Sequence, residues 1–508
     1  MGVRRFAGLA AGLALLWGAA ALVAGSQPAD EQAHQHLAPA QARMLVSPLD
    51  LTRADLDAGK AAYAAHCARC HGEDGRGTAA GAALALPVPD LAAADQRAHA
   101  EGEVYWVVSQ GSPRGVMPRF DAVLSEQARW QVVAHVRGLA GIRVAVSEGD
   151  GSGYVWDLPP GFPRPKVPAD NPMSIEKVEL GRHLFWDTRM SVNGTFSCGS
   201  CHEPRFAFSD DKARAVGATG EVHPRSSMSL ANVAYSPVLT WANPTQRRLE
   251  TQALVPMFGE EPVELGLSGM EGELLRQLRA EPDYQRLFPE AYPDEADPFT
   301  LLNITRAIAS FQRTLISGRA PYDRYRLGLD PQAIPAEAVR GEALFFSEAL
   351  ECFHCHGGFN FTETVDHVGK GFAEIEFHNT GLYNVDGAGA YPAPNTGVHA
   401  VSDDPEDMGR FKAPTLRNIA LTAPYMHDGS LATLEEVIAH YEAGGRAIPD
   451  GPNAGIGADS PYKSSFVKGF TLTPAQRREL IAFLETLTDE AFTRDPRFQN
   501  PWTAGGRP

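Results

Sequence analysis

The stretch ECFHCHGG (residues 351–358) places two cysteines and two histidines within five consecutive positions. The same Cys-x-x-Cys-His pattern occurs at residues 67–71 and 198–202, and the three copies contain all six cysteines of the chain. Cys-x-x-Cys-His is the attachment signature of c-type haem. A zinc site would instead need two cysteine pairs, or a cysteine pair with a spaced histidine pair. Three copies that use every cysteine therefore predict three covalently bound c-type haems.

In each copy the two thiols are expected to bond to the porphyrin, and the adjacent histidine is expected to ligate the iron. The predicted attachment residues are Cys67, Cys70, Cys198, Cys201, Cys352 and Cys355. The predicted proximal ligands are His71, His202 and His356. His354 occupies a variable position of its motif and is expected to be a bystander.

The N-terminus has the features of an export segment, as covalent haem attachment requires. A basic start, MGVRR, precedes an uncharged apolar run over residues 6–25. That run is long for a signal peptide and just long enough to span a bilayer. We therefore expect residues 1–28 to be either a cleaved signal peptide or a retained anchor in the inner membrane. Both alternatives place the body of the protein in the periplasm.

The remaining composition is that of a globular protein, with room for two to four domains in 508 residues. The formal net charge of −17 disfavours nucleic acid and anionic lipid as partners. An acidic surface also suits a basic redox partner, although such surfaces are common among proteins of every class.

Each haem motif follows a similar helical lead-in: DAGKAAYAAHC, VELGRHLFWD or VRGEALFFSEALEC. Gly59, Gly181 and Gly341 occupy like positions in these stretches, each followed three and four residues later by an apolar pair. The repetition predicts a mainly α fold with three cytochrome c-like haem domains.

The first of these domains, residues 48–143, looks like an ordinary monohaem cytochrome c. Ser125 is expected to cap a helix. Within it, the residues that start with Trp130 recur at the i, i+3, i+4, i+7 spacing of one helix face. In such cytochromes the methionine of a Met-Pro pair is the sixth iron ligand, and Met117 matches it. A thioether opposite imidazole raises the reduction potential, which suits electron delivery. A linker rich in glycine and proline follows at residues 144–170.

Four stretches beyond the linker carry a family resemblance: DNPMSIEKVELGRHLFWDTRMSVNGTFSCGSCH, HPRSSMSLANVAYSPVLTWANP, LETQALVPMFGEEPVELG and FKAPTLRNIALTAPYMHDGSLATLEEVIAHYEAGG. The chain here resembles the bacterial dihaem cytochrome c peroxidase/MauG family. Within that family, these stretches are most similar to the MbnH-like branch. The resemblance implies that the last two haem domains form one dihaem module. Its peroxidatic-haem domain would span residues 171–330 and its second-haem domain residues 331–490, with a C-terminal tail at 491–508.

The resemblance also assigns a peroxide site. It implies that His202 is the proximal ligand of the peroxidatic haem and that Gln252, Pro256 and Glu264 lie on the open distal side. Peroxide cleavage needs a group that takes a proton from one oxygen and returns it to the other, a role that fits Glu264. Composition alone would make Glu264 a surface residue of an acidic loop. Trp241 matches the tryptophan that the family places between its two haems.

The distal ligand of the second haem distinguishes branches of the family. Typical peroxidases place a methionine fourteen residues after the histidine of an HDG motif, whereas MauG-like members place a tyrosine there. That histidine is His427 in this chain, and the position fourteen residues later is Tyr441. Met426 is a competing candidate. A phenolate stabilises higher oxidation states of iron, whereas a thioether stabilises the ferrous state.

Two family features are matched incompletely. The loop histidine that blocks the peroxidatic iron in some relatives has no match, because His223 lies three residues before the aligned Ser226 and is expected to be structural. Relatives hold a calcium ion between the haems through an asparagine side chain and two carbonyls. Thr422 and Pro424 match the carbonyls, but Ser226 replaces the asparagine, with Asn232 nearby. One calcium ion therefore remains an open alternative.

Taken together, these features predict a periplasmic trihaem oxidoreductase that uses hydrogen peroxide to oxidise a partner protein. A competing function is a peroxidase that reduces hydrogen peroxide to water. Its electrons would come from a small cytochrome, a cupredoxin or quinol and enter through the N-terminal haem. A third alternative is a non-enzymatic multihaem electron carrier, which would need protein ligands on both sides of every iron.

Overall fold

The computed structural model describes residues 53–84, 88–112, 116–142 and 154–502, together with residue 144 and single positions between 38 and 51. The predicted signal or anchor segment lies outside the described residues. Among the described residues, no helix is long and apolar enough to cross a membrane. Helices predominate and the strands are short, which confirms the mainly α prediction.

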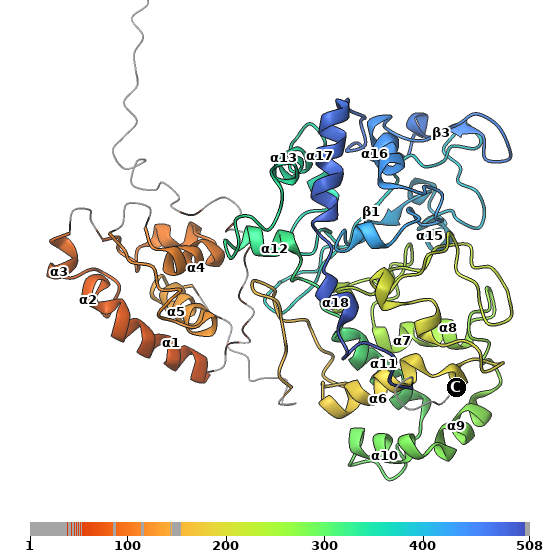
Figure 1. The fold of residues 1–508 in the computed structure, drawn as a ribbon, viewed down its shortest axis with the longest axis horizontal. Helices are drawn as coiled ribbons and strands as arrows, with labels where there is room; N and C mark the ends of the chain where they lie inside the picture. Colours follow the sequence, from red (N-terminus) through yellow and green to blue (C-terminus); the bar gives the residue numbers. More distant parts are fainter. Residues whose placement is uncertain are drawn as a thin grey trace, which may run out of the picture.

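The N-terminal helices form a lobe of their own, drawn in orange in Figure 1. They are α1 (Arg53–His66), α2 (Ala68–His71), α3 (Ala79–Ala82), α4 (Glu101–Gln110) and α5 (Glu126–Leu139). The Ser125 hydroxyl accepts a hydrogen bond from the Ala128 N–H at 3.2 Å, so the predicted cap of α5 is confirmed. Trp130 is buried in the core of the lobe, where Tyr105 stacks on it with ring centroids 4.0 Å apart.

The middle unit, residues 171–330, is built mostly from helices that surround one core. They are α6 (Ile175–Trp186), α7 (Leu249–Gln252), α8 (Leu254–Phe258), α9 (Glu271–Ala280), α10 (Pro282–Ala291) and α11 (Leu301–Arg313). Helix α12 (Pro321–Arg326) follows them, but its Tyr322 packs in the core of the C-terminal unit, against Phe361 and Phe483. Apolar residues of α6, α9, α10 and α11 make up most of this core, including the fully buried Leu180, Leu278 and Phe288.

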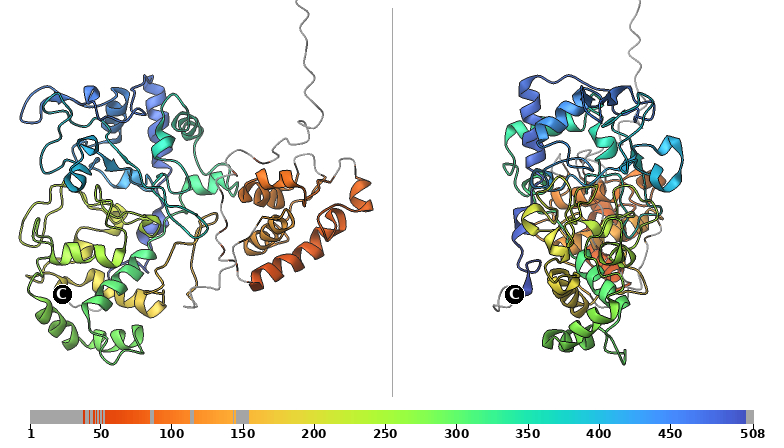
Figure 2. Two further views of the ribbon diagram at one scale, coloured as in Figure 1. Left: turned by 180° about the vertical axis from the view of Figure 1, so that it is seen from behind. Right: turned by 90° about the vertical axis from the view of Figure 1, so that its right-hand side faces the viewer.

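The C-terminal unit, residues 331–490, lies beside the middle unit and is drawn from green-teal to blue in Figures 1 and 2. Its helices are α13 (Ala336–Phe345), α14 (Cys352–Cys355), α15 (His399–Ser402), α16 (Leu434–Glu442) and α17 (Pro474–Glu485). Its strands are β1 (Phe377–His378), β2 (Phe411–Lys412), β3 (Ala447–Ile448) and β4 (Gly455–Ile456). The antiparallel pair β1–β2 matches Phe377 with Lys412, and β3 pairs antiparallel with β4.

The three parts share one construction, in which the helix before each haem motif crosses the last long helix of the same part. The crossing pairs are α1 with α5, α6 with α11, and α13 with α17. A Cβ atom at Gly59, Gly181 or Gly341 would lie 2.0, 1.9 or 1.9 Å from the carbonyl oxygen of Gln131, Ala307 or Glu479, respectively. Only glycine allows the two backbones to approach so closely. The repeated lead-in glycine therefore marks the helix crossing.

The predicted C-terminal tail is part of the fold as far as residue 502. Helix α18 (Glu490–Arg494) runs back to the middle unit, where Phe492 and Phe498 pack with Phe208 and Phe311. The Trp502 indole N–H donates a hydrogen bond to the His183 carbonyl of α6 at 3.0 Å. The end of the chain thus joins the C-terminal unit to the middle unit.

Replacing Gly181 with Ala should destabilise the protein, because the added methyl group would force α6 and α11 apart. We expect a loss of about 1–3 kcal/mol in the free energy of unfolding, typical of overpacking. The matched control is Gly272→Ala in α9 of the same unit, where an added Cβ meets no atom within 4 Å. Alanine is the better helix former, so this control should gain up to about 1 kcal/mol. Urea unfolding of both variants is the measurement, and equal stabilities would contradict the crossing argument.

Candidate active site

The three cysteine motifs have the same local turn. They lie in α2, in a 3-10 turn at Cys198–Ser200 and in α14. In each motif the histidine N–H donates to the carbonyl of the first cysteine at 3.0 Å. All six cysteines are among the described residues, and none of them forms a disulfide. The thiols are thus free for attachment to a porphyrin, as the sequence predicts.

The proximal histidines of the middle and C-terminal units are oriented by backbone carbonyls. The Nδ1–H group of His202 donates to the Phe208 carbonyl at 2.8 Å. That of His356 donates to the Pro414 carbonyl at 3.1 Å. Burial lowers the pKa of both imidazoles, so they are held neutral. With Nδ1 acting as donor, Nε2 keeps a lone pair for a metal, as ligating histidines require.

A cavity beside α14 has the residues that a c-type haem needs. We name it the larger cavity; it encloses about 1400 Å³ free of protein atoms, part of it open to solvent. Cys352, Cys355 and His356 line it together with apolar side chains. These include Phe345, Leu350, Leu382, Leu416, Ile438, Val467, Leu480 and Leu484. Two thiols and an imidazole beside apolar walls fit the covalent attachment of a porphyrin.

Both candidate distal ligands reach the larger cavity. Tyr441 lies on α16, and Met426 lies in the preceding loop with a positive φ of 72°. Burial raises the pKa of the Tyr441 phenol well above its usual 10. A tyrosine so buried favours its neutral form unless a cation shares the cavity. Tyr441 and Met426 therefore both line the larger cavity, and the choice of ligand between them stays a prediction.

A cluster of Cys355, Glu363 and His378 borders the same cavity. Their potential ligand atoms all lie within 4.8 Å of one another, and the imidazole of His378 contacts the Glu363 carboxylate. Although burial opposes protonation, the contacts with Cys355 and Glu363 raise the pKa of His378 to about 10. Since Cys355 belongs to the attachment motif, this group is part of the haem surroundings rather than a separate metal site.

The predicted peroxide residues come from three consecutive pieces of the middle unit. Gln252 ends α7, Pro256 lies in α8, and Glu264 lies in the loop that follows. The Leu265 N–H donates to the Pro256 carbonyl at 2.9 Å, which ties that loop to α8. The Ala218 N–H donates to the Glu264 carbonyl at 2.6 Å from the other side.

The Glu264 carboxyl is largely buried and acts electrostatically on the second haem motif. Burial raises its pKa from 4.5 to about 6. After burial itself, the Glu264 charge is among the causes that raise the pKa of the Cys198 and Cys201 thiols. The structure thus places this glutamate close to the Cys198–His202 turn, where it can exchange a proton near neutral pH. It is not an ordinary surface residue of the acidic loop.

A buried ion pair, not singled out from the sequence, holds α7 in place. The Glu250 carboxylate accepts hydrogen bonds from Arg313 of α11 and from Asn171, both at 2.8 Å. Glu250 and Arg313 are each only 4% exposed. Because Gln252 lies two residues after Glu250, this pair positions the start of the predicted peroxide site. The partners lie 63 positions apart in the sequence, so no local pattern reveals them.

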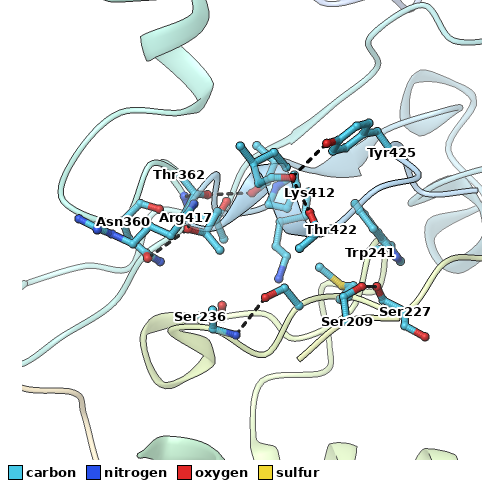
Figure 3. A pocket seen from close by; sticks show the side chains of 18 of the residues that line it. Ser209, Ser227, Ser236, Trp241, Asn360, Thr362, Lys412, Arg417, Thr422 and Tyr425 are labelled. Atoms are coloured by element: carbon cyan, nitrogen blue, oxygen red, sulfur yellow. Dashed lines mark hydrogen bonds between the residues drawn. The ribbon is translucent and has the colours of Figure 1, made fainter. Parts of the chain in front are cut away.

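Trp241 lies between the middle and C-terminal units. Its indole N–H donates to the Ser226 carbonyl at 3.0 Å, and its own carbonyl accepts from the Lys412 N–H at 2.8 Å. It lines the larger cavity and a second, smaller cavity of about 740 Å³ free of protein atoms, part of it open to solvent. Figure 3 shows the smaller cavity, with Trp241, Lys412 and Thr422 among the labelled residues that line it.

The residues considered for calcium do not all gather at one place. Thr422 and Pro424 line the smaller cavity. Ser226 donates through its hydroxyl to the Met426 carbonyl at 3.1 Å. Asn232 is fully buried elsewhere, where its side chain bonds to the backbone of Ser317 and to the Asn360 side chain. Asn232 therefore does not supply the asparagine ligand that Ser226 lacks.

Two other histidines have structural surroundings, as the sequence predicts. The His223 ring accepts a hydrogen bond from the Arg225 N–H at 3.0 Å. His354 stacks on Phe466 with ring centroids 4.5 Å apart and contacts Glu351 at 2.7 Å.

In the N-terminal lobe, Met117 packs against the core beside α2. The Ser112 side chain accepts from the Met117 N–H at 3.1 Å, and the Ser112 N–H donates to the Met117 carbonyl at 3.0 Å. Burial lowers the pKa of His71, so that imidazole is neutral as well. The lobe thus contains the two residue types of a His–Met iron site.

Free Cys-x-x-Cys-His turns on crossed helices, a largely buried glutamate near one of them and a tryptophan between two units are consistent with a c-type haem protein of peroxidase type. Comparisons with known proteins agree. Residues 175–330 match the family described as di-haem cytochrome c peroxidase. Residues 54–136 match the family described as cytochrome c oxidase, cbb3-type, subunit III.

Individual proteins that are similar in sequence or structure identify the family. The chain is 36% identical over 334 residues to the methylamine utilization protein MauG of Methylorubrum extorquens, an alignment that covers 65% of this chain and 83% of that protein. It is 33% identical over 390 residues to cytochrome-c peroxidase IdrP1 of Denitromonas iodatirespirans, covering 72% and 97%. A crystal structure of a MauG-like protein associated with microbial copper homeostasis matches with a TM-score of 0.68 and 48% identity, over 69% of this chain and 100% of that chain. The chain therefore belongs to the MauG/dihaem cytochrome c peroxidase family of oxidoreductases.

The ligand at the larger cavity can be tested by two substitutions. If the Tyr441 oxygen is the ligand, Tyr441→Met should raise the reduction potential of one haem, because a thioether favours ferrous iron. Met426→Leu, on the same wall, should leave every potential unchanged. Spectroelectrochemical titration of both variants is the measurement. A shift in Met426→Leu alone would make Met426 the ligand.

Proposed function

We propose that the protein is a periplasmic c-type haem oxidoreductase that reacts with hydrogen peroxide and oxidises a partner protein. Three covalent haems would be held by the three cysteine motifs, with His71 and Met117 in the N-terminal lobe and His202 in the middle unit. His356 and Tyr441 would serve the C-terminal unit. When bound, the haem irons supply the redox chemistry with peroxide.

The observation that carries this proposal is the place of Tyr441. The buried phenol of Tyr441 reaches the cavity that Cys352, Cys355 and His356 line. The family resemblance aligns Tyr441 with the position at which typical peroxidases have a methionine. A phenolate there favours oxidising equivalents that persist long enough to reach a protein substrate. The solved structure that is 48% identical is described as MauG-like and associated with microbial copper homeostasis, which favours the same setting for this chain.

The residues of the middle unit have complementary roles in this proposal. The Glu264 carboxylate takes a proton from one peroxide oxygen and returns it to the departing oxygen. The Gln252 amide orients the peroxide, and Pro256 ties α8 to the Glu264 loop through its carbonyl. The Trp241 indole lies between the units and is placed to relay an electron from one side to the other.

A second candidate function is the reduction of hydrogen peroxide to water. The N-terminal lobe favours it, because residues 54–136 match a cytochrome family and offer a His–Met site where electrons could enter. A small cytochrome, a cupredoxin or quinol would then be the donor. The third alternative, a non-enzymatic electron carrier, is not supported, since the relatives are haem peroxidase-type oxidoreductases.

The two enzymatic functions differ in the oxidation state of the haem irons that reacts with hydrogen peroxide. The test is stopped-flow absorption of the fully ferric protein mixed with one equivalent of hydrogen peroxide, repeated over a series of pH values. If the protein oxidises a partner, the ferric protein should react fast without prior reduction. The rate should increase as pH rises through about 6, because only the deprotonated Glu264 can accept the proton and burial raises its pKa to about 6. A ferric protein that stays inert until it is reduced would favour the peroxidase function.

Glu264→Gln isolates the contribution of the carboxylate. Loss of a general acid–base group should slow the reaction by about 10²–10⁴-fold and abolish the rise near pH 6. Glu261→Gln is the matched control, because Glu261 is an exposed glutamate of the same loop. It should retain both the rate and the pH profile. Equal effects of the two substitutions would remove Glu264 from the mechanism.

A further inference from the structure

Lys412 is a buried cation between the two haem units. It lies at the end of β2 with only 6% of its surface exposed, and it lines both the smaller and the larger cavity. Its ammonium group donates to the Val238 carbonyl at 2.7 Å. Figure 3 shows the side chain extending from the C-terminal unit toward the segment of the middle unit that carries Ser236.

The surroundings of Lys412 lack a carboxylate. Three lysine or arginine side chains are buried among the described residues: Arg313, Lys412 and Arg417. Arg313 pairs with Glu250 and Arg417 pairs with Asp323, at 2.8 and 2.9 Å. Within the described part of the chain, Lys412 has no such ion pair, and the lining of the smaller cavity includes neither aspartate nor glutamate.

An ammonium group in this position is costly to bury. Desolvation lowers the pKa of Lys412 to about 8, and no nearby charge offsets it. A buried charge is normally paired, and an ammonium has three N–H donors. The Val238 carbonyl accounts for one of them. Two donors and a full positive charge therefore face a cavity whose walls offer no anion.

We propose that Lys412 is an anion-binding residue that holds a propionate carboxylate of a haem in the cavity between the two units. The inference rests on the proposed function, with a haem bound in the larger cavity that Lys412 also lines. Propionates are the anionic groups of haem, and Lys412 borders the larger cavity that fits it. The backbone N–H of Lys412 also bonds to the Trp241 carbonyl, so the same residue fixes both the carboxylate and the backbone of the bridging tryptophan.

A fixed positive charge beside a haem carboxylate stabilises the reduced, less positive state of the iron. Lys412→Met should therefore lower the reduction potential of one haem, with haem content unchanged. We expect the ferrous-to-ferric ratio at a fixed electrode potential to fall about tenfold, which is about 59 mV for a one-electron couple. Resonance Raman bands of propionate bending should shift in the same variant, which reports on the carboxylate itself.

Three further variants complete the test. Lys412→Arg keeps the charge and should retain a potential near that of the wild type. Lys412→Gln keeps a hydrogen-bond donor without the charge and should reproduce the lower potential if Lys412→Met fails to fold. Lys166→Met is the control, because Lys166 is half exposed and pairs with Asp366.

Unchanged potentials and unchanged propionate bands in haem-loaded Lys412→Met or Lys412→Gln would overturn the proposal and leave Lys412 a structural link to Val238. These measurements use the resting protein without peroxide. Their outcome is therefore independent of whether the protein oxidises a partner or reduces peroxide.

Discussion

The direct contact of a glycine with the backbone of a crossing helix fixes the position of each cysteine motif. At Gly59, Gly181 and Gly341 the lead-in helix lies so close to its partner that a methyl group would overlap a carbonyl oxygen. The motif begins at Cys67 directly after α1, and at Cys198 and Cys352 after the loops that follow α6 and α13, so the crossing anchors the segment that carries the two thiols and the histidine. The same contact, made three times, gives one chain three similar binding turns.

The functional centre depends on how two of these units meet. Trp241 is held by the Ser226 carbonyl within the middle unit and by the Lys412 N–H of the C-terminal unit. Lys412 in turn bonds to Val238 across the same boundary. Helix α18 and the residues up to Trp502 return to the middle unit and hold the pair together. In the proposed function, charge transfer between the units would therefore depend on this interface.

Local sequence patterns predicted the features that depend on neighbouring residues. The Cys-x-x-Cys-His turns, the cap at Ser125 and the lead-in glycines follow from spacing and residue type. The role of Glu264 came from family resemblance, because composition alone made it a surface residue. The structure shows that Glu264 is largely buried and that its charge acts on Cys198, whereas its role in the reaction stays a prediction.

The features that were missed depend on contacts between distant segments. The Glu250–Arg313 pair, the His378–Glu363 contact and the buried ammonium of Lys412 join residues with no shared periodicity. A lysine in a two-residue strand gives no sign that it is buried. The return of α18 to the middle unit is likewise set by aromatic packing across the fold rather than by the sequence of the tail itself.

The measurement that tests the account most directly is the number of haems per chain, obtained by intact mass spectrometry with pyridine haemochrome absorption. The shared helix crossings and free cysteine pairs predict three covalent haems, and replacing Cys352 and Cys355 by Ser should leave two. A wild-type chain with only two haems and one pair of thiols open to alkylation would contradict the claim that each of the three units binds a covalent haem.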